Sequence, residues 1–349
     1  MKSLIIKFRF LLFPLSLFYW GMIIWRNIYY NIGFFVTSKI HRPVISIGNI
    51  VTGGTGKTPA VIYFARKLTE TGVKVVVLSR GYGRKSTGTV IVSDGENKKA
   101  SLQDSGDEPF LMAKKLTGVP IVVDEVRYRG GLFAIKKFNP DVIILDDGFQ
   151  HRSLYRDMDI VLLNSIDTPK DYKLFPYGNL REPFLHLKRS DFIIWTKTNF
   201  AQPPPTLRNK IFQMKIPQCR SYMRPGKEMK TTNGSMILFS EIAAKRIYAF
   251  CGVADPLSFK KLLKGAGAEL VRFNIFNDHH IYNTEELKGM QIEGEELNAD
   301  IYLTTEKDFY KVIEVSPNDM AIYSVRLEFT LPGKVEKRLL GEIYSKLKN

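Results

Sequence analysis

The residues best suited to chemistry lie in a glycine-rich stretch that directly follows the apolar run VISIG. The stretch consists of Thr52, Gly53, Gly54, Thr55, Gly56, Lys57 and Thr58. Glycines let backbone N–H groups approach phosphate oxygens, and a helix that begins there adds its positive dipole end. In such a loop the lysine reaches the β- and γ-phosphates, and the hydroxyl after it binds Mg²⁺. We therefore expect a nucleotide site in which Lys57 neutralises the transferred phosphate and Thr58 holds the metal.

One position departs from the usual phosphate-loop pattern, GxxxxGK[ST], because Val51 stands where the first glycine is expected. The alternative interpretation is a glycine-rich turn in which Gly-Lys-Thr occurs by chance. An apolar strand before the loop and a helical pattern over residues 56–70 favour the phosphate loop, because the motif binds phosphate in that setting.

A second candidate element is the apolar run PDVIILDDG, which ends in two acidic residues. Its Asp146 is the expected companion of a phosphate loop, because a carboxylate at a buried strand end holds Mg²⁺ directly or through water. Alone, the run would read as a strand with an ordinary Asp-Gly turn. Gln150 and His151 follow it, where loops after parallel strands bind ligands. In the run GNLREP, Arg181 and Glu182 are candidates for contact with nucleotide or phosphate, with a surface ion pair as the alternative.

Candidate acid–base residues lie in two further runs. Asp107 and Glu108 open a helical pattern, and Ser105 with Glu108 also fits a capping box. The helix dipole that stabilises these acids lowers an aspartate pKa and weakens a base, so a base at Asp107 needs a partner. His279 or His280, in the run NDHH, is the candidate partner, and metal binding by this pair is the alternative.

The elements that position these residues alternate between apolar strands and helical patterns. Strands are expected over residues 44–47, 73–78, 120–123, 142–145, 160–163 and 192–195, with helices over 56–70, 107–116 and 126–137. Strands without polar alternation, separated by helices, indicate a mainly parallel sheet covered on both faces. We expect an α/β fold of the P-loop NTPase type with a second, smaller α/β domain. The expected segments are an anchor (1–38), a phosphate-loop domain (39–202), a connection (203–246) and a C-terminal domain (247–349).

Composition narrows the class of protein. The 349 residues carry a formal net charge of +16, which attracts polyanions such as an anionic membrane face or a phosphorylated substrate. No zinc-finger spacing, aromatic RNA-binding signature or compact basic block favours nucleic acid. The two cysteines, Cys219 and Cys251, are far apart and suggest neither a zinc site nor a disulfide framework.

The N-terminus contains an apolar segment. Residues 10–25 carry no charge, and residues 27–38 are also uncharged and rich in aromatic side chains. A signal peptide is disfavoured because no small-residue cleavage pattern follows, and a buried core helix is the other alternative. Trp20 and Trp25 suit a membrane interface. We expect an uncleaved membrane helix within residues 1–38, either spanning the bilayer or lying in its interface, with the basic residues on the cytoplasmic side.

Several longer motifs occur together along the chain. They are ISIGNIVTGGTGKTP, LSRGYGR, GDEP, LDDGFQHRSLYRDMDIVL, GNLREP, FNDHHIY and TTEKDFYK. In this order they resemble the tetraacyldisaccharide 4′-kinases, the lipid A 4′-kinases. The resemblance runs from the first residues to about Lys311, and only residues 202–246 match nothing. The family usually lacks the first loop glycine too, so Val51 is no objection.

The resemblance implies MgATP-dependent transfer of the γ-phosphoryl group to the 4′-hydroxyl of a tetraacylated glucosamine disaccharide 1-phosphate. It implies two α/β/α domains with the active site between them, and a location on the cytoplasmic face of the bacterial inner membrane. Asp107 matches the family's proposed base and His279 its partner. Further matches to active-site positions are Glu108, Arg127, Asp146, Asp147, Gln150, His151, Arg181 and Glu182. The glycolipid's acyl-chain preference, the direct Mg²⁺ ligands and the oligomeric state stay open.

Two rival functions use a similar loop. Membrane-associated regulatory ATPases of the deviant-loop kind carry a lysine before the two glycines, where this chain has Thr52, and they leave Asp107 and His279 without a role. A GTP-dependent switch requires an [NT]KxD motif after a late strand, and the run TKTN after Trp195 ends in asparagine instead. Both comparisons favour the kinase.

Overall fold

The computed structural model describes residues 12–317 and 319–347. Contacts divide the chain into two compact units: Met223–Glu328 forms one, and the described residues on either side of that segment form the other. These limits differ from the expected segments. The predicted connection, 203–246, is shared between the two units, and the chain from Phe329 onward returns to the first unit.

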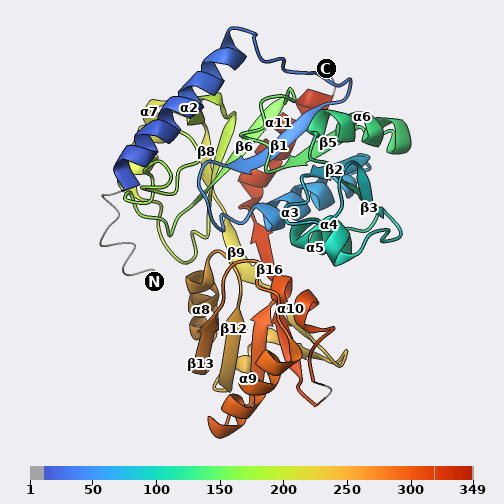
Figure 1. Ribbon diagram of the computed structural model, residues 1–349, viewed down its shortest axis with the longest axis vertical. Coiled ribbons are helices and arrows are strands. Elements are labelled where there is room, and N and C mark those ends of the chain that lie inside the picture. Colours follow the sequence, from blue (N-terminus) through green and yellow to red (C-terminus); the bar gives the residue numbers. More distant parts are fainter. Residues whose placement is uncertain (1–11, 318, 348–349) are drawn as a thin grey trace. The chain divides into compact units, whose positions relative to one another are not determined.

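The first unit is built on an eight-stranded sheet with the order β3-β4-β2-β5-β1-β6-β7-β8 (Figure 1). Its described neighbours pair in parallel except β3 with β4. Burial of every residue of β1, β2, β5, β6 and β7 fits a sheet that is covered on both faces, so the expected mainly parallel α/β fold is confirmed. The strands are β1 (Val44–Asn49), β2 (Val75–Ser79), β3 (Val90–Asp94), β4 (Pro120–Val123), β5 (Val142–Asp146), β6 (Met158–Asn164), β7 (Phe192–Thr196) and β8 (Gln218–Arg220).

Helices cover this sheet on both sides. Figure 1 shows α6 on one side of β2 and β5, with α3 and α5 on the other. Helix α6 buries its apolar residues against alternate side chains of β2 and β5, such as Leu78 and Ile143. The helices are α3 (Lys57–Thr69), α4 (Leu102–Ser105), α5 (Asp107–Lys115), α6 (Arg127–Phe138), η2 (Phe184–Arg189), α7 (Pro205–Gln213) and α11 (Gly333–Leu347).

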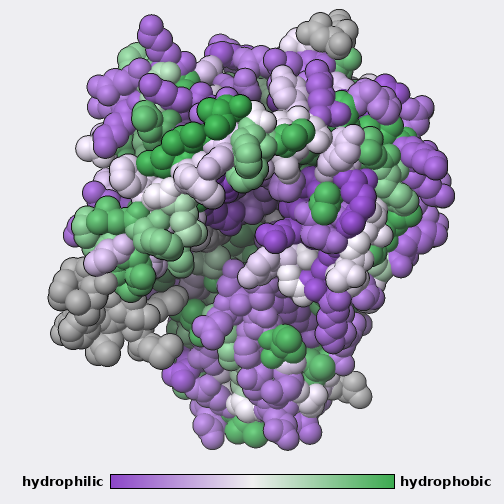
Figure 2. Space-filling model, turned by 45° about the horizontal axis from the view of Figure 1, so that its top comes forward, coloured by the Kyte–Doolittle hydropathy of each residue, from purple (hydrophilic) through white to green (hydrophobic). Residues whose placement is uncertain are grey.

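Helix α2 (Phe13–Asn31) buries two polar residues beside Ile23 and exposes most of its apolar residues. Ser16 and Asn27 are buried, whereas Phe18 and Trp25 are 71% and 60% exposed. Figure 2 shows hydrophobic residues gathered on the surface where α2 begins. No helix of the described chain is both long and apolar enough to cross a membrane, so the spanning form of the expected anchor is not found there. Lys2, Lys7 and Arg9, the basic residues before the apolar segment 10–25, lie outside the described residues.

The second unit contains a six-stranded sheet with the order β11-β10-β15-β14-β12-β13. Four of its strands are parallel neighbours, and β10 and β11 add an antiparallel edge. The chain passes between the units through β9 (Tyr222–Pro225) and β16 (Leu327–Thr330), which pair with each other. The remaining elements are β10 (Glu228–Thr231), β11 (Met236–Leu238), η3 (Phe239–Ile242), β12 (Arg246–Cys251), α8 (Pro256–Gly265), β13 (Glu269–Ile275), α9 (Thr284–Glu296), β14 (Ile301–Thr305), α10 (Glu306–Val312) and β15 (Ile322–Val325).

Candidate active site

The glycine-rich loop lies at the carboxyl edge of the sheet, between β1 and α3. Strand β1 pairs directly with β5, and Ile47 is in register with Asp146, so the loop and the acidic strand end are neighbours as expected. Gly53 and Gly56 have φ values of 111° and 84°, in a region that side chains other than glycine rarely adopt. Gly56 caps α3, which places Lys57 and Thr58 in the first helical turn.

Residues at the end of β7 and directly after it hold this loop in place. Lys197 Nζ donates to the Gly54 carbonyl over 2.7 Å, and Thr196 Oγ1 donates to the Thr55 carbonyl over 2.8 Å. The Asn49 side chain donates to Thr55 Oγ1 over 2.9 Å. These bonds fix the loop backbone from the protein side. The run TKTN, which failed as a guanine-recognition motif, therefore has a structural role that its sequence pattern did not reveal.

Asp146 is buried at the end of β5, and one of its two carboxylate oxygens accepts a hydrogen bond from the described residues. Ser79 Oγ donates to Oδ2 over 2.8 Å, whereas Oδ1 is buried without a hydrogen-bond partner in the described structure. Burial, together with the negative charges of Glu108 and Asp147, raises the pKa of Asp146 to about 7. A buried carboxylate with an unused oxygen fits Mg²⁺, which prefers such oxygens and compensates their charge.

The fit to Mg²⁺ does not require a dense ligand cluster. Residues 12–317 and 319–347 contain no group of three or more His, Cys, Asp or Glu side chains that could hold a metal. At nucleotide sites Mg²⁺ takes one or two protein ligands and completes its shell with phosphates and waters. Thr58 and Asp146 stay the predicted ligands for that mode, and among the described residues His279 and His280 belong to no such group of three.

Asp147 joins the loop lysine to the run GNLREP. Lys57 Nζ lies 3.7 Å from Asp147 Oδ1, and Arg181 Nη1 donates to Asp147 Oδ2 over 2.8 Å. Burial alone would raise the pKa of Asp147, but the charges of Lys57 and Arg181 outweigh it and lower the pKa. Asp147 is therefore an anion that holds two cations beside the phosphate loop, so Arg181 is not an isolated surface residue.

Glu182 is the centre of a buried polar cluster. Its Oε1 accepts from Gln150 Nε2 over 2.9 Å, and its Oε2 accepts from Arg189 Nη2 over 2.7 Å and lies 3.0 Å from His186 Nδ1. Gln150 also donates to the Asn49 carbonyl over 2.7 Å, at the start of the phosphate loop. Glu182 is fully buried, so its ion pairs are not at the surface, and its contact with nucleotide stays a prediction.

Arg127 lies near the two aspartates, and His151 lies near Arg127. Arg127 is buried, and burial lowers its pKa to about 10, so the guanidinium stays charged at neutral pH and is attracted to Asp146. Burial and the charges of Arg127, Arg156 and Arg80 lower the pKa of His151 to about 4, so this imidazole is neutral. Its Nε2 lies 2.9 Å from Ser153 Oγ. At neutral pH Arg127 is therefore a cation and His151 is uncharged.

Asp107 and Glu108 occupy the first turn of α5, as expected. The predicted capping box is wrong: Gly106 is the N-cap of α5, and Ser105 Oγ donates instead to the Ser101 carbonyl over 2.6 Å. The reason is the short helix α4, which ends at Ser105. Glu108 contributes to the raised pKa of Asp146, which places its charge near the acidic strand end.

His279 lies in the second unit, in the loop after β13. It has a φ of 64°, which is unusual for a residue with a side chain, and its backbone N–H donates to Asp278 Oδ1 over 3.1 Å. Strained backbone of this kind is often found at functional sites. His280 differs, because its ring stacks on Phe276 with centroids 4.5 Å apart. Asp107 and His279 belong to different units, so their pairing stays a prediction.

Comparison with known proteins agrees with this geometry. Residues 8–344 match the family model described as tetraacyldisaccharide-1-P 4′-kinase. The tetraacyldisaccharide 4′-kinase of Aquifex aeolicus is 41% identical over 304 residues, which cover 86% of this chain and 89% of the relative. That of Halothermothrix orenii is 34% identical over 353 residues, which cover 94% and 90%. The crystal structure of LpxK from Aquifex aeolicus in complex with ATP matches with a TM-score of 0.76 at 36% identity and covers 97% of this chain and 99% of that chain.

These matches extend over nearly the whole chain and include both units. The regulatory ATPase alternative is therefore not favoured, and the nucleotide bound by the crystallised relative is ATP. The chain belongs to the tetraacyldisaccharide-1-phosphate 4′-kinase family.

Proposed function

We propose how this chain performs the reaction of its family, ATP-dependent phosphorylation of the 4′-hydroxyl of a tetraacylated glucosamine disaccharide 1-phosphate. The observation that carries the proposal is the phosphate loop beside Asp146, whose buried Oδ1 has no hydrogen-bond partner among the described residues. Phosphoryl transfer depends mainly on positioning and on charge neutralisation. This edge of the sheet supplies both.

On the nucleotide side, the residues of this chain bind and neutralise phosphate. Loop amides and Lys57 contact the phosphates, and Arg127 and Arg181 add positive charge. Thr58 and Asp146 hold Mg²⁺, which neutralises charge on the phosphate oxygens when it is bound with ATP. Asp147 orients Lys57 and Arg181, because its carboxylate lies between them.

On the acceptor side, Asp107 takes the proton of the sugar hydroxyl. The N-terminus of α5 keeps this carboxylate ionised, and His279 acts as the partner that orients it toward the hydroxyl. Replacing His279 with Ala should lower the rate of transfer by about 10²-fold, within the usual range for acid–base residues. Purified, ATP-binding H279A protein with unchanged transfer to lipid would exclude this role.

Helix α2 places the enzyme on the membrane surface by lying in the interface. Its inner face is fixed by polar contacts: Tyr19 donates to the Arg181 carbonyl over 2.7 Å, and Ser16 Oγ accepts from Tyr177 N–H over 2.9 Å. Its outer face is apolar, with Phe18 and Trp25 exposed. A helix with its polar face on the protein and its apolar face outward suits a lipid surface, because the apolar face can insert into the bilayer interface.

The location that follows is the cytoplasmic face of the bacterial inner membrane, where a glycolipid acceptor and cytosolic ATP meet. Flotation with vesicles that contain anionic lipid tests the membrane contact. The double variant Phe18→Glu and Trp25→Glu should lose flotation and keep ATP binding, whereas the exposed-charge control Glu342→Gln should float as the wild type does. Equal flotation of all three proteins would contradict the role of α2.

A further inference from the structure

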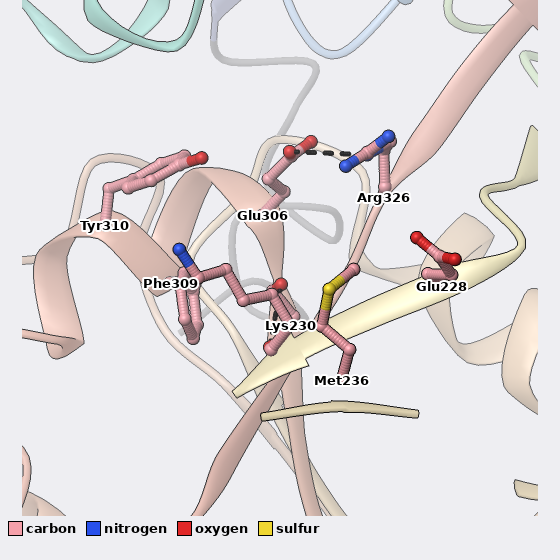
Figure 3. A pocket seen from close by; sticks show the side chains of 8 residues that line it. Glu228, Lys230, Met236, Glu306, Phe309, Tyr310 and Arg326 are labelled. Atoms are coloured by element: carbon pink, nitrogen blue, oxygen red, sulfur yellow. Dashed lines mark hydrogen bonds and ion pairs between the residues drawn. The ribbon is translucent and has the colours of Figure 1, made fainter. Parts of the chain in front are cut away.

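The run Thr305-Glu306-Lys307-Asp308 has no explanation in the phosphate-transfer scheme. It forms the junction of β14 and α10, and each of its charged side chains contacts a different part of the second unit. Glu306 Oε1 lies 3.7 Å from Arg326 Nε, and both residues line a cavity of about 70 Å³. Figure 3 shows the two side chains directed at each other. Asp308 Oδ2 accepts from the Gly252 N–H over 2.9 Å and from Thr305 Oγ1 over 2.7 Å. The contacts of Glu306 and Asp308 therefore hold parts of the second unit together.

Lys307 instead contacts the loop that carries the two histidines. Its ammonium lies 3.0 Å from Asp278 Oδ1 and 3.4 Å from Nε2 of His279. Only 16% of the lysine side chain is exposed, so these contacts are partly shielded from water. One turn further along α10, Lys311 Nζ donates to the His280 carbonyl over 3.3 Å. Helix α10 therefore holds this loop through two lysines, and one of them contacts the imidazole of His279.

The contact with Lys307 favours one of the two neutral tautomers of His279. An ammonium group has three donors and no acceptor, so the ring nitrogen that it meets accepts through its lone pair. The neutral ring then carries its proton on Nδ1. Asp278 Oδ2 is 3.8 Å from the same Nε2 and alone would favour a proton there. That distance exceeds hydrogen-bond range, and Asp278 already accepts from Lys307, so the lysine contact prevails.

His280 provides the opposite case in the same loop. Its Nε2 lies 3.2 Å from Glu286 Oε2, and a carboxylate can only accept, so Nε2 of the neutral His280 ring carries the proton. The neighbouring histidines are thus expected to be opposite tautomers.

We propose that Lys307 is a positioning residue that fixes His279 in the Nδ1–H tautomer and so makes Nδ1–H the group that it offers to the base. The catalytic part of this inference rests on the proposed pairing of His279 with Asp107, whereas the tautomer does not. A histidine that orients a carboxylate acts through an N–H, and the wrong tautomer in a catalytic hydrogen-bond chain can cost up to about 10⁴-fold in rate. The role is indirect, because Lys307 acts through His279.

NMR of ¹⁵N-histidine-labelled protein at pH 8, above the usual imidazole pKa of about 6.5, tests the tautomer directly. The chain has five histidines, and the His279→Ala and His280→Ala variants assign the relevant signals. We expect an unprotonated Nε2 at His279 and a protonated Nε2 at His280. The Lys307→Met variant should lose the Nδ1–H preference at His279 and leave His280 unchanged. A proton on Nε2 of wild-type His279, or an unchanged tautomer in Lys307→Met, would overturn the proposal.

Transfer assays test the consequence. Lys307→Met should lower kcat by about 10-fold or more with little change in KM for ATP, and Lys307→Arg, which keeps a donor, should recover much of the loss. Lys288→Met removes one exposed charge from α9 and should match the wild type in both assays. Normal kcat in a Lys307→Met protein with a changed tautomer would overturn the positioning role. Wild-type protein without any transfer would instead refute the proposed kinase function, and the NMR result would still decide the tautomer.

Discussion

Removal of the Glu182 carboxylate should destabilise the first unit strongly and impair the phosphate loop as well. The side chain is fully buried and accepts from Gln150, lies against His186 and pairs with Arg189. Glu182→Ala leaves the guanidinium of Arg189, whose side chain is only 25% exposed, without its ion-pair partner. It also frees Gln150, which bonds the Asn49 carbonyl at the start of the loop.

The magnitude follows from burial. Removing one partner of a buried ion pair costs about 3–5 kcal/mol, because the other charge stays desolvated and unpaired. The exposed pair Arg338–Glu342 provides the control, since its side chains are 63% and 38% exposed. Glu342→Ala should cost about 0.3–0.5 kcal/mol, the usual value for an exposed helical pair.

Urea unfolding followed by tryptophan fluorescence measures this difference. All three tryptophans, Trp20, Trp25 and Trp195, belong to the unit that contains Glu182, so the signal reports that unit. Burial would raise the pKa of Glu182, but His186 and Arg189 lower it below the unfolded value. The stabilisation is therefore present at neutral pH and is lost as pH falls through the lowered pKa, so wild type and variant should converge in acid. A loss below about 1 kcal/mol at pH 7 would refute the reasoning.

Three further predictions follow from single contacts. Asp146→Asn keeps the volume but removes the charge, so the Mg²⁺ concentration for half-maximal transfer should rise at least about 10-fold; an unchanged Mg²⁺ titration would contradict the ligand assignment. The pKa of His151 is about 4, below the value of about 6.5 expected in the unfolded chain, so its contribution to stability is full above pH 6.5 and falls toward pH 4. His151→Gln should flatten the pH dependence of unfolding in that window, and parallel curves would exclude the effect. Gly130→Ala should cost about 1–3 kcal/mol, because the new Cβ would lie 2.8 Å from Leu78 Cδ1 and from Asp124 Cβ. Gly341→Ala, in open space on α11, should not destabilise, and equal unfolding midpoints for the two glycine variants would contradict the packing argument.

The parallel sheet and the neighbouring phosphate loop and Asp146 were predictable from sequence, because local signals determine them. Apolar runs without alternation identify buried parallel strands, and a glycine-rich turn before a helix has a specific chemistry. The run YRGG after Arg127 also has a physical reason in the structure, since Gly130 packs against Asp124 and Leu78.

The roles of Lys197, Glu182 and Lys307 were not predictable, because each depends on a partner in another element of the fold. Lys197 bonds Gly54, and Lys307 meets a histidine 28 residues earlier. The capping box at Ser105 was predicted from a local pattern and was wrong because a second short helix intervenes. Local patterns identify elements, whereas contacts between elements decide which side chains act together.

The central claim is that Asp107 acts as the base in transfer of the γ-phosphate of ATP to the lipid disaccharide. The direct test incubates detergent-solubilised protein with γ-labelled ATP, Mg²⁺ and lipid A disaccharide 1-phosphate, beside Asp107→Ala and a control without lipid. We predict label on the lipid with wild type and a loss of about 10²–10⁴-fold with Asp107→Ala, the usual range for a general base. Equal transfer by both proteins would exclude Asp107 as the base, and no transfer by folded, ATP-binding wild type would contradict the proposed reaction itself.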